Sequence, residues 1–355
     1  MFLFTLKFVY LWRDVSAHIK TMPKHDFVTS KVLDMKKILG MGNALVDIMT
    51  TVPNDDVLAQ FNLPKGSMQL IDADLSHKIV EIIGQYNPRI TAGGSSANTI
   101  HGLAGLGAKC GFLGKIGTDK MGQMFKTDMD KAGITTHLYT SDTASGRAVA
   151  FVTPDSERTF ATYLGAAVEL AATDINASVF AQYDYFYIEG YLVQDHNLIE
   201  TAIKTARNQK MKVVIDLASY NVVDENRDFL RRIINDYVDI VFANEEEAKS
   251  FTGKDAEAAA EEIASMCDIA VVKIGKRGSI IRQGSKVYRA GIIDANCIDT
   301  TGAGDLYAAG FLYGLITDQP LDRCGYLGAL LSGKVIENIG GQISAEGWEE
   351  IRKEL

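Results

Sequence analysis

The run Asp-Thr-Thr-Gly-Ala-Gly-Asp at residues 299–305 places small residues and two carboxylates directly before a long apolar segment. If that segment is a helix, residues 302–304 open it with backbone N–H groups that have no partner inside the helix. Such amides, assisted by the helix dipole, bind anions. Asp305 stands at the same end as a base, and amides together with a positioned base are what phosphoryl transfer requires. An ordinary turn capped by Thr300 or Thr301 explains the same spacing equally well.

A second run of small residues, Ala-Gly-Gly-Ser-Ser-Ala-Asn at residues 92–98, also precedes an apolar segment. From its spacing it is a turn followed by a helix, with Ser95, Ser96 or Asn98 as the cap. Its glycine pair also permits close approach of the backbone to a ligand and a change of backbone angles at a hinge.

Strands and helices alternate after residue 35, and this order must position the two runs. Short, β-branched apolar segments are typical of strands covered on both faces of a parallel sheet, and they occur at residues 38–42, 213–215, 237–243 and 269–274. Helical patterns lie between them, at residues 245–251 and 256–265. We therefore predict a doubly wound α/β fold with a mostly parallel sheet and helices on both faces. Ligands of such sheets lie beyond the carboxyl ends of the strands, where Asp216, Asn244 and Gly275 fall.

One section departs from this alternation. Residues 146–163 are predicted to form a strand, a turn and a second strand, which does not belong to a βαβ layer. We assign residues 50–71 and 144–165 to a small β-rich lid. The α/β core then comprises residues 35–49, 72–143 and 166–355. Residues 1–34 form an N-terminal extension, which is either a leader, a peripheral segment or the product of a start codon placed too early.

Composition narrows the class of protein. The 355 residues contain 47% hydrophobic residues, enough for a large core, and the net charge of −9 argues against a nucleic-acid binder. No apolar stretch is long enough to predict a membrane span. The four cysteines contain no C-x-x-C spacing, which favours a reducing compartment and a cytoplasmic location. Neither a Walker P-loop nor a Rossmann fingerprint is present.

The run at residues 299–305 resembles the C-terminal signature of the ribokinase-like (pfkB) family of carbohydrate and nucleoside kinases, and the resemblance extends over residues 35–355. It implies an ATP- and Mg²⁺-dependent kinase, and in parts of this family a monovalent cation as well. The resemblance gives the backbone of Gly302, Ala303 and Gly304 the role of an anion hole. Asp305 then acts as the catalytic base.

The same resemblance assigns the remaining site residues. On the substrate side it implies Asn43, Asp47, Gly93, Gly94 and Asn98. On the nucleotide side it implies Thr301, Asn244, Lys273, Gly275, Lys276 and Gly278. Glu247, the fourth residue of the N-x-x-E pattern that begins at Asn244, is implied to help place Mg²⁺. From spacing alone, the acidic residues at 245–247 are a solvated helix start, and residues 275–278 are a basic β-turn.

Residues 158–167 and 187–192 are most similar to the adenosine kinase branch, in which Tyr191 would stack on a purine and Arg158 would reach a phosphate. The alternatives are that Tyr185, Tyr187 and Tyr191 are ordinary strand residues and that Arg158 pairs near Glu157 at the surface. We therefore expect a kinase for a primary hydroxyl of a ribose-containing substrate, with adenosine first. A ribose, fructose or ketodeoxy-sugar kinase is the alternative, and a nucleotide-binding protein without turnover is a third possibility. The expected partner is a small molecule, with no nucleic acid and no membrane, and the chain is either a monomer or a homodimer.

Overall fold

The computed structural model describes residues 35–155 and 157–355. The chain divides into two units, Met1–Met35 and Lys36–Leu355, and every element below belongs to the second. The predicted extension at residues 1–34 lies outside the described residues.

A large sheet carries the core, as predicted. In spatial order its strands are β14 (Lys286–Ala290), β13 (Ser279–Gln283), β12 (Ile269–Lys273), β11 (Ile240–Asn244), β10 (Lys212–Asp216), β9 (Tyr185–Glu189), β1 (Ile38–Met41), β5 (Cys110–Gly117) and β6 (Thr135–Ser141). The strands from β12 to β6 are parallel, whereas β13 and β14 are antiparallel. β11 begins later than predicted because the preceding helix runs to Tyr237.

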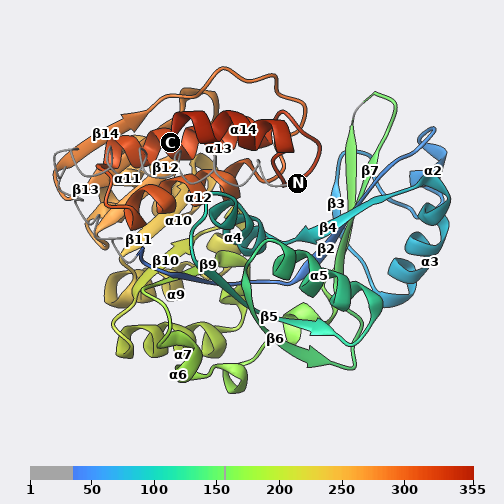
Figure 1. Cartoon of the computed structure of the whole chain (residues 1–355), viewed down its shortest axis with the longest axis horizontal. Helices are drawn as coiled ribbons and strands as arrows, with labels where there is room; N and C mark the ends of the chain where they lie inside the picture. The colour runs from blue at the N-terminus through green and yellow to red at the C-terminus, as the bar shows by residue number, and fades with distance from the viewer. Residues whose placement is uncertain (1–34, 156) are drawn as a thin grey trace, which may run out of the picture. The chain divides into compact units, whose positions relative to one another are not determined.

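Helices cover both faces of this sheet (Figure 1). On one face lie α4 (Ser95–Gly105), α12 (Ala303–Ile316) and α13 (Leu321–Val335), where the Phe311 ring packs edge-on against Phe242 of β11 with ring centroids 5.4 Å apart. On the other face one buried apolar cluster joins the sheet to α7 (His196–Asn208), α9 (Arg227–Tyr237), α10 (Glu245–Thr252) and α11 (Ala256–Ala264). The doubly wound prediction is thereby confirmed.

The order of the strands reverses between β9 and β1. From β1 the sheet continues to β5 and β6 on one side, and from β9 it continues to β10, β11 and β12 on the other. Ligands of doubly wound sheets bind at such a reversal, beyond the carboxyl ends of the strands. Four neighbouring strands end there on polar residues, namely Glu189, Asp216, Asn244 and Lys273.

A second, smaller sheet contains the predicted hairpin. Its strands are β3 (Met68–Leu70), β8 (Arg158–Tyr163), β7 (Gly146–Val152), β2 (Leu45–Thr51) and β4 (Arg89–Gly93), and β7 and β8 are antiparallel (Figure 1). This sheet reaches beyond the two predicted lid segments, because β2 pairs with β7 along its whole length and β4 pairs with β2.

The remaining helices flank these sheets or connect their strands. They are α2 (Asp56–Ala59), α3 (Ala73–Ile83), α5 (Lys120–Lys131), α6 (Ala177–Phe180), α8 (Tyr220–Glu225) and α14 (Ala345–Glu354). In the part of the chain that the structure describes, no helix has the length and apolar character needed to cross a membrane.

Candidate active site

The start of α12 is built around a left-handed glycine. Gly302 is the N-cap residue with φ +75°, and no side chain caps the helix. The alternative in which Thr300 or Thr301 caps this turn is therefore wrong. A Cβ at Gly302 would lie 2.8 Å from the Cα of Gly341, so both the backbone angle and the packing require glycine here.

The first turn of α12 presents free amides. Leu306 is the first residue that donates an i→i−4 bond, to the carbonyl of Gly302 (2.8 Å), and the N–H of Ala303 donates to Thr300 O (3.2 Å). The N–H groups of Gly304 and Asp305 come before the helical bonds begin and need an acceptor from outside the helix. The predicted anion hole therefore rests on these two amides more than on that of Ala303.

Asp305 is held by α4. Ser95 Oγ donates to Asp305 Oδ1 (2.7 Å), and Asn98 Nδ2 donates to Oδ2 (3.0 Å). The predicted side-chain cap of α4 is absent, because the N-cap residue is Gly94 with φ +97° and no side-chain bond. Asn98, expected to reach substrate, contacts the Asp305 carboxylate in this structure. Sequence reasoning missed Ser95 as a site residue because its position was fully explained by capping.

A buried ion pair lies beside the α12 start. Lys273 Nζ is 2.8 Å from Asp216 Oδ2, and a Cβ at Gly304 would lie 3.2 Å from the same Nζ. The lysine therefore faces the free amides. Burial lowers the pKa of Lys273, but Asp216 and Glu247 outweigh it and leave the pKa above its ordinary value. The ammonium group thus stays positive where an anion would bind.

Asn244 and Glu247 form a capping box at the start of α10. The Asn244 side chain accepts from Glu247 N (2.9 Å), and the two oxygens of Glu247 accept from Asn244 N and Nδ2 (both 2.7 Å). Glu246 is exposed, as a solvated helix start predicts, whereas Glu247 is buried. Burial, with help from Asp216, raises the pKa of Glu247 to about 7.

Glu189 was not predicted as a site residue. It links Asn43, which precedes β2, to Ser96 at the start of α4. Its Oε1 accepts from both the backbone N and Nδ2 of Asn43 (2.8 and 2.7 Å), and its Oε2 accepts from Ser96 N (2.8 Å). The carboxyl group is fully buried, and this burial raises its pKa to about 7. The usable sequence signal was an acidic residue at the end of a buried strand, the same position that drew attention to Asp216.

Gly93 and Gly94 must be glycines because other atoms lie too close to leave room for a side chain at either position. A Cβ at Gly93 would overlap the Asp47 carboxylate, and one at Gly94 would overlap the carbonyl oxygen of Asn43. Asp47, on β2, is thus brought against the turn that precedes α4. Burial, together with the charge of Asp305, raises the pKa of Asp47 to about 7.

These raised values predict how stability depends on pH. Asp47, Glu189 and Glu247 titrate near pH 7 when folded but near their ordinary values when unfolded. Between about pH 4 and 7 the folded chain binds more protons, so its free energy of unfolding falls as pH rises through this window. Desolvation lowers the pKa of His101 and His137, which act in the opposite direction.

We expect the melting temperature of the chain without ligands to drop by at least about 3 °C from pH 5 to pH 8. Calorimetry at matched ionic strength measures it. The Asp47→Asn variant should give a shallower slope, because it removes one of the three carboxyls. A melting temperature that rises from pH 5 to pH 7 would contradict the assignment.

Arg158 links the small sheet to the loop before α12. Its Nη1 is 2.6 Å from Asp299 Oδ1, and its Nη2 donates to Ile298 O (2.8 Å). Asp299 also accepts from the N–H groups of Thr301 (2.7 Å) and Gly340 (2.8 Å). The surface alternative, in which Arg158 pairs near Glu157, is therefore wrong. The arginine is bound to Asp299, the first residue of the run at residues 299–305.

Tyr191 lies two residues after Glu189, in the 3₁₀ turn η4 (Gly190–Gln194). The strand alternative is therefore wrong for Tyr191, and it is right for Tyr185 and Tyr187, which lie in β9. The side chain of Tyr191 is 39% exposed. Burial of its hydroxyl raises its pKa, as do Glu189 and Asp305, so the hydroxyl lies among the carboxylates of the site.

The predicted nucleotide-side turn, η5 (Gly275–Arg277), follows β12 directly. Lys276 is exposed there, and Gly275 has open space around it. A Cβ at Gly278 would overlap Ala290 O, so packing against β14 already explains this glycine. Arg277 pairs with Glu245 across the neighbouring helix start.

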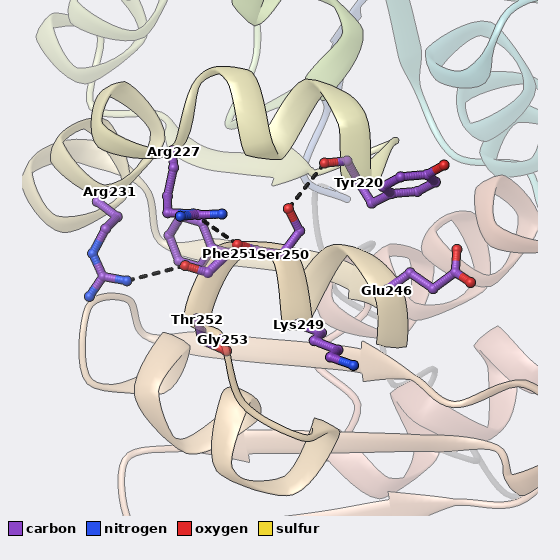
Figure 2. Close-up of a pocket in the computed structure, with 9 residues that line it drawn as sticks. All are labelled: Tyr220, Arg227, Arg231, Glu246, Lys249, Ser250, Phe251, Thr252 and Gly253. Atoms are coloured by element: carbon purple, nitrogen blue, oxygen red, sulfur yellow. Dashed lines mark hydrogen bonds between the residues drawn. The ribbon is translucent and has the colours of Figure 1, made fainter.

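A separate hollow of about 840 Å³ lies over the end of α10 (Figure 2). Arg227 Nε donates to Ser250 O (2.9 Å) and Arg231 Nη1 to Phe251 O (3.4 Å), so the two arginines satisfy carbonyls at the C-terminal end of this helix. None of the predicted site residues lines it. The candidate site is therefore a different place, the group of side chains at the strand ends.

Three comparisons place this arrangement among known proteins. The pattern described as pfkB family carbohydrate kinase matches residues 65–348. A probable sugar kinase from Rhizobium etli is 34% identical, covers 90% of this chain and 98% of its own, and superposes with a TM-score of 0.81. Adenosine kinase from Sinorhizobium meliloti is 33% identical, with coverages of 90% and 100% and a TM-score of 0.80. Adenosine kinase 2 of Arabidopsis thaliana is 26% identical over 330 residues, 85% of this chain and 94% of that one.

Proposed function

The chain belongs to the pfkB family of carbohydrate kinases, and we propose that it transfers the terminal phosphoryl group of ATP to a primary hydroxyl of adenosine. The family expected from the run at residues 299–305 is confirmed, and the chain is a kinase. Its relatives include both sugar kinases and adenosine kinases, so the acceptor must follow from the site itself.

The surface beside Asp47 supports a nucleoside acceptor. In the small sheet the register places Asp47 opposite Ala148, Ala148 opposite Thr162, and Thr162 opposite Leu70. These side chains share one face, because register partners in a sheet point to the same side. The face is turned toward the core, since Arg158 on the same face reaches Asp299.

The neighbouring row of that face is apolar from Met49 through Ala150 and Phe160 to Met68, and beyond Met49 it ends at Arg89 of β4. Met68 of this row and Leu70 of the Asp47 row are 62% and 68% exposed. A pentose has hydroxyls on all sides and gains little from such a wall, whereas a purine presents two flat apolar faces. This apolar wall beside a hydroxyl-binding carboxylate is the observation that carries the proposal. We propose that the small sheet acts as a lid over the adenine ring and that Tyr191 faces this ring from the core.

Each residue of the site has its own role in the proposed reaction. Asp47 accepts bonds from two vicinal ribose hydroxyls, since both oxygens of a carboxylate are acceptors, while Asn43 and the glycine pair fix the position of the ribose. Asp305 takes the proton from the attacking hydroxyl. Lys273 and the amides of Gly304 and Asp305 stabilise the negative charge that develops.

The nucleotide side fits ATP with Mg²⁺, because a buried ammonium, two free amides and the buried carboxyl of Glu247 converge beyond the strand ends. When bound, ATP supplies the phosphoryl group and Mg²⁺ offsets its charge. Within residues 35–155 and 157–355, no group of three or more His, Cys, Asp or Glu is placed to hold a metal. Most ligands of a bound Mg²⁺ would thus be phosphate oxygens and water, with Glu247 acting through water. Thr301 and the turn at residues 275–278 border the same side.

An ADP-release assay with adenosine, guanosine, ribose and fructose tests the acceptor. We expect kcat/KM for adenosine to exceed that for ribose by about 10²-fold, because the base buries apolar area against the wall. Phe160→Ala should raise KM for adenosine about tenfold and leave the value for ribose unchanged. Ribose or fructose as the better acceptor would contradict the nucleoside proposal and favour the sugar kinase alternative.

A further inference from the structure

Three polar residues on one face of α4 all contact Asp305. Ser95 and Asn98 donate to its two carboxylate oxygens, and Thr99 Oγ1 lies 3.2 Å from its backbone O. Their spacing of i, i+3 and i+4 places them on one side of a helix. The two helices pack closely at this point, because a Cβ at Gly102 would lie 2.6 Å from Leu306 Cδ1. α4 therefore fixes both the main chain and the carboxylate of Asp305.

The hydroxyl of Ser95 has no role in the helix itself. The N-cap residue is Gly94, and no side chain caps α4. The bond from Ser95 to Asp305 is the shortest contact that the carboxylate makes, at 2.7 Å. The next residue, Ser96, is buried, its backbone N–H donates to Glu189, and its Oγ has no hydrogen-bond partner. The two adjacent hydroxyls therefore differ in the bond to Asp305, which Ser95 makes and Ser96 does not.

We propose that Ser95 is a positioning residue for phosphoryl transfer, one that fixes the orientation of the Asp305 carboxylate toward the acceptor hydroxyl. Each carboxylate oxygen accepts about two hydrogen bonds. Ser95 and Asn98 occupy one position on each oxygen and leave the other for the attacking hydroxyl. With Asn98 as the only remaining anchor, the carboxylate rotates away from the line of transfer. This role rests on the proposed base function of Asp305.

The bond from Ser95 also affects the pKa of Asp305, because other charged groups surround this carboxylate. Carboxylates face it from three strands, Asp47 of β2, Glu189 of β9 and Asp216 of β10, along with the hydroxyls of Tyr187 and Tyr191. Lys273 of β12 is a cation that faces it. Burial raises the pKa of Asp305, and the bonds from Asn98 and Ser95 oppose this. Loss of the Ser95 hydroxyl therefore raises this pKa further.

The experiment compares Ser95→Ala, Ser95→Thr and Ser96→Ala in full pH–rate profiles with ATP, Mg²⁺ and adenosine. We expect Ser95→Ala to lower kcat by about 10- to 100-fold with little change in KM. The acid limb of its kcat profile should move up by about one pH unit. Ser95→Thr should restore most of kcat and the position of the acid limb, because it keeps the hydroxyl. Ser96→Ala should match the wild type.

Two outcomes separate this inference from the proposal on which it rests. If Ser95→Ala has the profile of Ser96→Ala while Asp305→Asn is inactive, Ser95 has no positioning role and Asp305 remains the base. If Asp305→Asn turns over normally, the base assignment itself is wrong. Melting curves of all variants reveal a folding defect, and if Ser95→Ala folds poorly, Ser95→Cys takes its place, because a thiol has a similar size but is only a weak hydrogen-bond donor. In Ser95→Cys, a lower kcat with an acid limb moved to higher pH supports the role, whereas an unchanged limb and unchanged kcat overturn it.

Discussion

Replacing Asp305 with asparagine is expected to lower kcat by about 10³-fold while leaving binding of ATP and adenosine close to wild type. The substitution keeps the size and shape of the side chain and removes its capacity to take a proton. An asparagine can also keep both neighbours, because its oxygen accepts from Asn98 Nδ2 and its amide donates to Ser95 Oγ. Single-turnover kinetics with ATP and adenosine would measure the loss in the chemical step.

Binding and stability provide the control for this variant. Titration calorimetry should give unchanged dissociation constants within about threefold, since neither ligand is held by the lost charge. The melting temperature should not fall, because removing one carboxylate from a group that includes Asp47 and Asp216 relieves like-charge repulsion. Turnover within about tenfold of wild type, with binding intact, would remove Asp305 from the role of base.

The fold could be predicted in outline because its signals are local. Buried parallel strands are short apolar runs, and Val213, Val214 and Ile215 of β10 are an example. The hairpin of β7 and β8 was recognisable from two strand-like runs around a turn. The pairing of β2 with β7, separated by about 100 residues in sequence, has no local signal. For this reason the small sheet is larger than its predicted segments.

Only part of the site could be predicted, because several of its contacts join residues that are distant in sequence. Motif residues such as Asp47 and Lys273 could be named from their place in a run, but their partners lie on other elements. Ser95 was interpreted as a cap because capping is a local property, and only the packing of α4 against α12 reveals its bond to Asp305. The surface alternative for Arg158 is wrong because its partner is Asp299, 141 residues away, and its expected contact with a phosphate stays a prediction. Predictions from sequence fail here where a contact joins distant segments.

Gly302 is the position at which a single methyl group should have the next largest effect. Gly302→Ala places a Cβ in a left-handed conformation and within 2.8 Å of the Cα of Gly341. Because the obstructing atom is backbone, the chain must move, and the amides of Gly304 and Asp305 move with it. We expect kcat to fall by at least about 10²-fold, as when one donor to a transition-state oxyanion is lost.

Gly253→Ala is the matched control. Gly253 ends α10 with φ +73°, nearly the angle of Gly302, but nothing lies within 4 Å of a Cβ there. Both variants therefore carry the same backbone strain, about 1 kcal/mol, and only Gly302→Ala carries the collision. If the two variants lose stability equally and both keep full kcat, the amides at the start of α12 tolerate displacement and cannot be stabilising the transferred phosphoryl group. A loss of kcat in Gly302→Ala but not in Gly253→Ala, with unchanged binding of adenosine, would show that the reaction depends on the position of these amides.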